Sequence, residues 1–252
     1  MRQALPSPFS RNNSYIGGMS PNAKPALRIA SWNIHKAVGT DRRRDADRVL
    51  AGIADLHADI VALQEADYRL GDRPSALPRD RIAAATGLEP LSIGRNSVSL
   101  GWHGNALLAR PGIHLCGLEH LDLPGHEPRG AVLVDLDTPA PLRIVAVHLG
   151  LLRSARRRQL DAIKAALSRH PVRPTVILGD FNERSRRVGL GRIATPFVIL
   201  PSQPTFPSRR PILPLDRIVH SPDLDLVPLS HAPARGHQPS DHLPLLAELR
   251  WL

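Results

Sequence analysis

The sequence predicts a single α/β domain, and two observations support this. Short apolar runs of strand length alternate with longer segments of helical periodicity, and polar residues stand beside the strand-like runs in a consistent direction. A chain of 252 residues fits one such domain and can bury a large core without covalent cross-links. The lone Cys116 excludes an internal disulfide, and we expect it to be a small buried residue.

Eight apolar runs predict the strands, because each has the length and the β-branched or aliphatic content of a buried strand. They are Leu27–Trp32, Asp59–Gln64, Ala106–Ala109, Ala131–Leu136, Leu142–Val147, Thr175–Leu178, Asp216–Ser221 and Leu243–Leu249.

Helical periodicity predicts two long helices. Arg44–His57 places apolar residues on one face, and Ser154–Arg169 does the same. The segment Pro196–Pro214 is rich in Pro, Ser and Arg and is expected to be a loop.

The ends of the chain suggest one domain preceded by a tail. Residues 1–26 lack hydrophobic periodicity and any signal-peptide core, so we expect a disordered tail followed by the domain at residues 27–252. The most apolar region, Leu142–Leu152, is interrupted by charged and polar residues and is too short to span a membrane. We expect a cytoplasmic monomer.

The formal charge of +10 comes mainly from arginine and favours anionic partners. Nucleic acid, phosphorylated metabolites and an anionic membrane surface all fit, and composition does not separate them. A GC-rich genome, in which arginine is encoded in place of lysine, explains the arginine content equally well. Three arginines in the first turns of the second helix, Arg156 to Arg158, fit either a solvated face or a phosphate-facing patch.

Polar residues stand beside six of the predicted strands. If the last two strands run antiparallel to the other four, these residues share one rim, where α/β proteins usually bind ligands. Four follow a strand and the others precede one: Asn33, Glu65, His148 and Asp180, then Asp216 and the Asp241-His242 pair.

Two of these residues suit a divalent cation. Glu65 ends an apolar run, and a carboxylate there is a hard oxygen ligand suited to Mg²⁺. Asn33 would orient Glu65 or contact the metal. Taken singly, Glu65 also reads as a charged residue beginning a loop, and Asn33 as a turn former.

The remaining rim residues suit proton transfer to or from water. Asp180 and Asn182 alternate in Gly179-Asp180-Phe181-Asn182, so a strand would point both side chains the same way. His242 can act as a general base if Asp216 holds its tautomer. Asp241 beside it either binds metal or caps a turn.

The motifs together resemble the endonuclease/exonuclease/phosphatase superfamily, in order, from about residue 27 to 250. They are Ser31-Trp32-Asn33-Ile34, Leu63-Gln64-Glu65, Val147-His148, Gly179-Asp180-Phe181-Asn182, Leu215-Asp216-Arg217 and Ser240-Asp241-His242-Leu243-Pro244-Leu245.

The resemblance implies a DNase I-like, four-layer αββα sandwich of two packed mixed sheets and Mg²⁺-dependent phosphoester hydrolysis, with Mn²⁺ as a substitute. It implies that Glu65 is the principal metal ligand, with Asn33 and Asp241 nearby. Asp180 and Asn182 would orient water and phosphate, and Asp216 would support His242. His148, where the abasic-site repair branch carries tyrosine, would stabilise the phosphoryl oxygens.

The substrate is the open question at this stage. His103-Gly104-Asn105-Ala106 and His148-Leu149-Gly150-Leu151 look like a small bacterial subgroup, in which Asn105 would line the substrate side unless it forms a structural turn. The basic cluster that begins at Arg153 would contact substrate. We expect an endonuclease-type hydrolase acting on DNA. The alternatives are a phosphodiesterase or phosphatase of phospholipid head groups or inositol-type phosphates, and a non-catalytic basic binding module.

Overall fold

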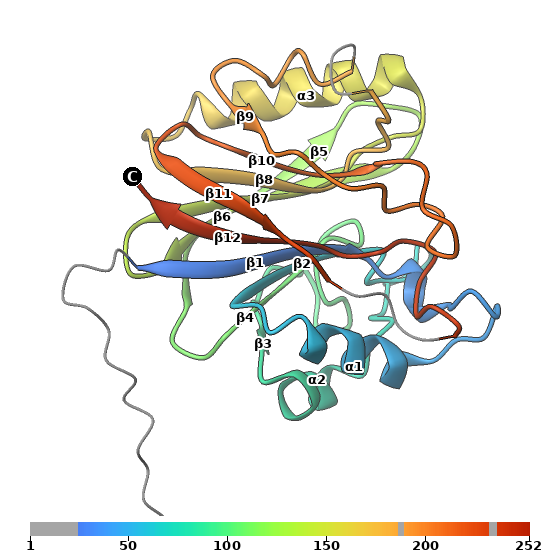
Figure 1. The fold of residues 1–252 in the computed structure, drawn as a ribbon. Coiled ribbons are helices and arrows are strands. Elements are labelled where there is room, and N and C mark those ends of the chain that lie inside the picture. The colour runs from blue at the N-terminus through green and yellow to red at the C-terminus, as the bar shows by residue number, and fades with distance from the viewer. Residues whose placement is uncertain (1–24, 186–188, 232–235) are drawn as a thin grey trace, which may run out of the picture.

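The computed structural model describes residues 25–185, 189–231 and 236–252. It contains two six-stranded mixed sheets that pack face to face (Figure 1). The first sheet has the order β11-β12-β1-β2-β4-β3 and the second β5-β6-β7-β8-β10-β9.

The strands of the first sheet are β1 (Ala26–Asn33), β2 (Ile60–Gln64), β3 (Glu89–Pro90), β4 (Ala106–Ala109), β11 (Leu224–Leu229) and β12 (Leu245–Trp251). Those of the second are β5 (His114–Leu123), β6 (Arg129–Asp137), β7 (Leu142–His148), β8 (Thr175–Asp180), β9 (Val198–Ile199) and β10 (Asp216–His220).

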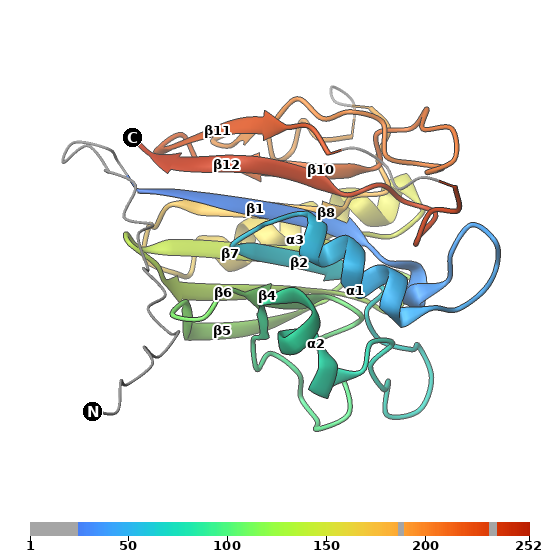
Figure 2. The same ribbon diagram turned by 60° about the horizontal axis from the view of Figure 1, so that its bottom comes forward.

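Helices cover the outer face of each sheet. The helices α1 (Ala46–Asp55) and α2 (Arg79–Thr86) lie on the first sheet, and α3 (Arg153–Leu167) lies on the second (Figures 1 and 2). A short 3-10 helix, η1 (His35–Ala37), follows β1. This is the expected four-layer αββα sandwich.

The hydrophobic core is divided among the three interfaces of the sandwich. Alternation along the strands sends Ile29 and Ile60 of the first sheet toward Ile144 and Val176 of the second, and all four side chains are fully buried. The strands carry apolar residues on both faces because each sheet is also covered by helices.

Strand direction confirms the expected common rim. The strand β1 runs parallel to β2, and β7 runs parallel to β8. The late strands β12 and β10 run antiparallel to β1 and β8, respectively. The C-terminal ends of β1, β2, β7 and β8 therefore lie at the same edge of the sandwich as the N-terminal ends of β10 and β12.

Both predicted helices form. The first is shorter than predicted: it begins after Asp45, whose side chain caps the backbone N–H groups of Asp47 and Arg48, and it buries Val49 and Ile53. The second, α3, begins at Arg153 and buries Leu160 and Ile163 against the second sheet.

Six elements were missed by the sequence prediction: η1, α2, β3, β5, β9 and β11. The strand β5 contains a register shift between Leu115 and Gly117 that breaks its alternation. The strand β11 contains Pro228, which is tolerated because β11 lies at the sheet edge. The helix α2 buries only Ile82 and has no side-chain cap, so its periodic signal is weak.

Two further expectations need correction. The predicted loop Pro196–Pro214 contains the two-residue strand β9, which adds to the edge of the second sheet beside β10. Cys116 is exposed rather than buried, and it lies within the register shift of β5, where inward and outward faces are exchanged.

The expected N-terminal tail, residues 1–26, lies outside the described residues except for Pro25 and Ala26, and Ala26 begins β1. No helix in the described part of the chain is long and apolar enough to cross a membrane.

Candidate active site

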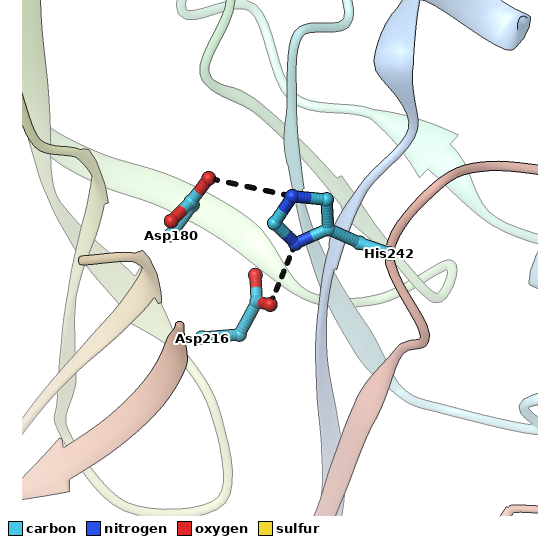
Figure 3. A group of neighbouring side chains, drawn as sticks. All are labelled: Asp180, Asp216 and His242. Carbon is cyan, nitrogen blue, oxygen red and sulfur yellow. Dashed lines mark hydrogen bonds and ion pairs between the residues drawn. The ribbon is translucent and has the colours of Figure 1, made fainter. Parts of the chain in front are cut away.

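A buried histidine between two aspartates forms the centre of the rim (Figure 3). His242 Nδ1 lies 2.8 Å from Asp216 Oδ2, which is a direct hydrogen bond. The other ring nitrogen, Nε2, lies 3.9 Å from Asp180 Oδ2. The imidazole thus has one nitrogen held by a carboxylate and the other turned toward Asp180.

Strand pairing brings the two aspartates together. Asp180 ends β8, Asp216 begins β10, and the antiparallel register places them directly opposite each other. His242 comes from the segment before β12. There Trp32 Nε1 donates to the His242 carbonyl oxygen at 2.9 Å, and Ser240 Oγ donates to the Asn33 carbonyl at 2.6 Å. These bonds fix the imidazole between the two sheets.

Burial and charge together set the protonation of this group. Burial would lower the pKa of His242, but the Asp216 carboxylate, with the charges of Asp180 and Asp241, raises it to about 9. Burial and the nearby Asp216 charge raise the pKa of Asp180 to about 7. Because the two groups interact, they titrate as a pair that can exchange a proton near neutral pH.

Asn33 bridges the two sheets at the same point. Its Nδ2 donates to Asp180 Oδ2 at 3.0 Å, and its Oδ1 accepts from the His35 backbone N–H at 3.1 Å. Both the NH₂ group and the carbonyl oxygen of this buried amide therefore form hydrogen bonds. Asn33 thus forms a hydrogen bond with Asp180, whereas the sequence suggested that it orients Glu65 or contacts a metal.

His148 lies beside Asp180 in the parallel register of β7 and β8. Its Nε2 is 3.4 Å from Asp180 Oδ2 and 3.0 Å from Arg129 Nη1. Burial and the Arg129 charge hold the pKa of His148 well below its usual value. The neutral ring accepts a hydrogen bond from Arg129 through Nε2, which places its own proton on Nδ1.

Glu65, the expected metal ligand, follows β2 and faces two cations. Its carboxylate contacts the Lys36 ammonium and lies 3.5 Å from Arg69 Nη2. Burial would raise the pKa of Glu65, but the Lys36 hydrogen bond and nearby charges, including that of Arg69, lower it to about 2. Glu65 is thus an ionised, partly buried carboxylate that already attracts a positive charge.

The donor set fits a divalent cation. Mg²⁺ takes one or two protein carboxylates, with water and substrate oxygens completing its shell. Glu65 supplies such a carboxylate, with Lys36 as the competing cation. Asp241 is more exposed and lies 3.7 Å from His35 Nδ1, so its carboxylate is also accessible.

A second grouping, Asp180, Asp216 and His242, places one ligating atom of each residue within 4.8 Å of the others. This spacing could also hold a metal ion. However, the 2.8 Å hydrogen bond between His242 and Asp216 is direct and leaves no space for an ion between those atoms. The two groupings therefore differ: His242 and Asp216 are joined directly, whereas the Glu65 carboxylate faces cations.

Three other predicted residues have different surroundings. Asn182 Nδ2 donates to the Leu149 carbonyl at 2.9 Å, and its backbone N–H donates to Asp180 Oδ1. Asn105 is fully buried and its amide donates to the carbonyls of Trp102 and Gly130, which favours a structural role. Arg153 is exposed at the first turn of α3.

Several site residues were missed by the sequence prediction. Lys36 could have been found, because it follows β1 just as the predicted residues follow their strands. Arg129 begins β6, and Glu127 holds it through Nη2 at 2.8 Å. Thr205, in the predicted loop Pro196–Pro214, donates from Oγ1 to Asp216 and was not predicted to contact it.

Backbone conformation marks the same region. Among the described residues, nine other than glycine have a positive φ, and seven of these belong to the loops around this site. These are His35, Lys36, Ala37, Glu65, Arg73, His103 and Asn182. Such conformations cost free energy and persist where the surrounding structure imposes them, which is common at functional sites.

Comparison with known proteins places these observations in context. A sequence model described as the Endonuclease/Exonuclease/phosphatase family matches residues 30–242. The protein YbhP of Escherichia coli strain K12 is 29% identical over 245 residues, which cover 89% of this chain and 96% of YbhP.

Solved structures share the fold at lower identity. An endonuclease/exonuclease/phosphatase from Beutenbergia cavernae superposes with a TM-score of 0.66 at 24% identity, covering 90% of this chain and 72% of that one. A mannosyl-6-phosphatase from Bacteroides thetaiotaomicron gives a TM-score of 0.67 at 19% identity, covering 89% and 100%.

Proposed function

The chain belongs to the endonuclease/exonuclease/phosphatase family, and on that premise we propose that it hydrolyses phosphodiester bonds in DNA by direct attack of water on phosphorus. The observation that carries this proposal is the buried Asp180–His242–Asp216 group. One imidazole nitrogen is held at 2.8 Å by Asp216, and the other faces Asp180 across 3.9 Å.

The proton of the attacking water passes to this group. As the water oxygen bonds to phosphorus, its proton goes to His242 Nε2 or to Asp180, and the bond from phosphorus to the leaving oxygen breaks. Asp216 holds the imidazole tautomer and stabilises its charged form. Both acceptors remain candidates for the base. Asp180, with a pKa of about 7, is partly ionised at neutral pH, whereas His242, with a pKa of about 9, accepts the proton only after releasing its own.

The remaining proposed roles follow from position. Asn33 aligns Asp180, and neutral His148 offers its Nδ1 proton to a phosphoryl oxygen. Asn182 holds the loop after β8 by bonding the Leu149 carbonyl. Arg153, exposed beside the rim, would contact the substrate backbone.

Glu65 would hold a divalent cation, Mg²⁺ or Mn²⁺, with Asp241 as a further ligand, and Asn33 close to both. When bound, such an ion supplies positive charge that stabilises the phosphoryl and leaving oxygens. Lys36 and Arg69 already direct positive charge to this position.

DNA is proposed as the substrate because the protein is strongly basic and cations line the pocket beside the site. Few aromatic residues are available for base stacking, which favours contact with the phosphate backbone. A second candidate is a phosphodiesterase or phosphatase of small phosphoesters, such as phospholipid head groups or inositol-type phosphates. It is supported by the shared fold with a mannosyl-6-phosphatase.

Nicking of supercoiled plasmid with Mg²⁺ tests the proposal. We expect nicked circles that disappear with EDTA, and a rate that falls steeply as salt rises, because binding to DNA releases counterions. Turnover of small phosphoesters without any nicking would favour the second candidate. No turnover of plasmid or small phosphoesters, with either Mg²⁺ or Mn²⁺, would contradict both.

A further inference from the structure

A pocket lined by Glu65 and His148 lies beside the proposed reaction site. Its other wall is formed by loops after β2, before β4 and before β6. The residues of this wall are Asp67, Tyr68, Arg69, Arg73, His103, Gly104, Glu127, Pro128 and Arg129.

Positive charge exceeds negative charge in this pocket. Four cations line it, Lys36, Arg69, Arg73 and Arg129, against three carboxylates. The Glu127 carboxylate forms an ion pair with Arg129. Asp67 accepts the backbone N–H groups of Leu100 and Gly101, and its burial raises its pKa.

Glu65 is left to balance two cations, and Arg73 forms no ion pair with a described carboxylate, although its charge acts on Asp67. The Lys36 ammonium contacts Glu65 directly, so Arg69 at 3.5 Å has only a shared partner. Arg73 Nη1 lies 2.9 Å from Nδ1 of His103, which is also 3.1 Å from the Pro128 carbonyl oxygen, and burial and the Arg73 charge lower the pKa of His103. In the described part of the chain, no ion pair joins Arg73 to a carboxylate.

The surrounding structure holds the basic residues of this pocket wall in fixed positions. Arg129 is 7% exposed and is fixed between Glu127 and His148. Arg73 and His103 hold left-handed backbone conformations, with φ of 53° and 49°. Gly104 has a φ of 80°, and a Cβ atom there would lie 3.4 Å from the Glu65 Cα, so the wall closes tightly on the site.

Four cations against three carboxylates leave one net positive charge in the pocket, and a divalent cation at Glu65 would add two more, so a substrate with one phosphodiester charge would leave an excess of positive charge. We propose that Arg69 and Arg73 bind a second phosphate group of the substrate, next to the phosphate that is hydrolysed. The inference rests on the proposed function and narrows its substrate to phosphoesters that carry another phosphate nearby. A polynucleotide and a polyphosphorylated small molecule both supply this chemistry.

Binding measured in EDTA tests the second phosphate site apart from catalysis. Calorimetric titration should show inorganic pyrophosphate binding about tenfold more tightly than inorganic phosphate, because charge-assisted hydrogen bonds to a second group are added. We expect Arg73→Gln and Arg69→Gln each to reduce this preference severalfold. Arg28→Gln, an exposed arginine of β1 outside the pocket, should retain it. Equal affinities in the wild type, or an unchanged preference in both pocket variants, would overturn the proposal.

Turnover then separates the two sources of the second phosphate. One pair of substrates is a dinucleotide with and without a 5′-phosphate, and the other is an inositol-type bisphosphate and monophosphate. We expect kcat/KM to be about tenfold higher for the doubly charged member of at least one pair, and Arg73→Gln to remove that ratio. Ratios near one in both pairs would contradict the proposal. If nothing is turned over, the proposed function fails while the EDTA titration still decides the binding site.

Discussion

At the scale of single residues, the site is a chain of close contacts among mostly buried charged and polar groups. Glu127, Arg129, His148, Asp180 and His242 follow one another with contacts of 2.8 to 3.9 Å. Burying such groups is costly unless each finds a partner. The Asp216 Oδ1 atom is the exception, since it is buried without a hydrogen bond, and this cost is consistent with selection for chemistry over stability.

Replacing Asp216 with Asn tests the central ion pair directly. We expect the pKa of His242 to fall from about 9, because the largest positive influence on it is removed. The pKa of His242 is thus higher in the folded protein than its ordinary value of 6.5. The His242–Asp216 ion pair therefore stabilises the fold fully below pH 6.5, and this contribution is lost as pH rises through about 9. Asp216→Asn should therefore destabilise the protein most at low pH.

The measurement is an NMR titration of the His242 ring in EDTA, with urea unfolding at pH 6 and pH 10. Asp225→Asn, a change on the exposed side of β11, is the matched control. An unshifted His242 titration in Asp216→Asn would show that the pair is not formed in solution.

Cation binding belongs to Glu65 in this account. We expect Glu65→Gln to raise the Mg²⁺ concentration needed for half-maximal activity by about tenfold or more, since a charged ligand becomes a neutral one. Calorimetric Mg²⁺ titration provides a readout that does not depend on turnover. Asp59→Asn, at the start of β2 on the opposite rim, should bind Mg²⁺ like the wild type, and the same affinity in Glu65→Gln would remove Glu65 as a ligand.

Residue roles were only partly predictable from the sequence. The strand-end rule found Asp180, His148 and Asn33, because a strand places its last side chain at the rim. It did not find Arg129, which lies at the start of a strand that runs opposite to β7. Its proximity to His148 arises from sheet pairing that local pattern does not encode.

At the scale of elements, strand register does most of the positioning. The parallel pairing of β7 with β8 sets His148 beside Asp180, and the antiparallel pairing of β10 with β8 sets Asp216 beside it. A shift of one residue in either pair would turn these side chains to the other face. Buried alternation on both faces fixes the register.

Helix α1 supports the first sheet without taking part in the site. Asp45→Ala should cost about 1 kcal/mol of the free energy of unfolding, since two backbone N–H groups lose their cap. Urea unfolding measures this loss, and turnover should be unchanged. Asp47→Ala removes only an exposed ion pair with Arg81 and should cost less. Equal costs for the two variants would show that the cap contributes nothing.

Elements with strong periodicity were predicted, and weak ones were missed. Eight strands and two helices carry continuous apolar patterns, and these are the elements that pack against the main core. The strands β5 and β11 lie at sheet edges, where one side faces solvent and the pattern is diluted. Sheet order itself depends on long-range pairing and was not predicted, because the family resemblance implied only two packed mixed sheets flanked by helices.

At the scale of the whole molecule, the site exists only when the two sheets pack together. Asn33 and Asp180 are 147 residues apart and belong to different sheets, and Trp32 bonds the His242 backbone across 210 residues. The active centre is therefore assembled by the inter-sheet core rather than by any one segment. Variants that loosen this core should lose the site before they lose secondary structure.

Turnover of a phosphodiester by the His242→Ala variant tests the central claim most directly. The assay compares kcat with Mg²⁺ for the wild type, for His242→Ala and for His220→Ala, a histidine of β10 outside the site, with circular dichroism to confirm folding. The account predicts that His242→Ala folds normally and loses about 10²–10⁴-fold in kcat, the usual contribution of a general base, while His220→Ala retains turnover. Wild-type turnover in folded His242→Ala would contradict it.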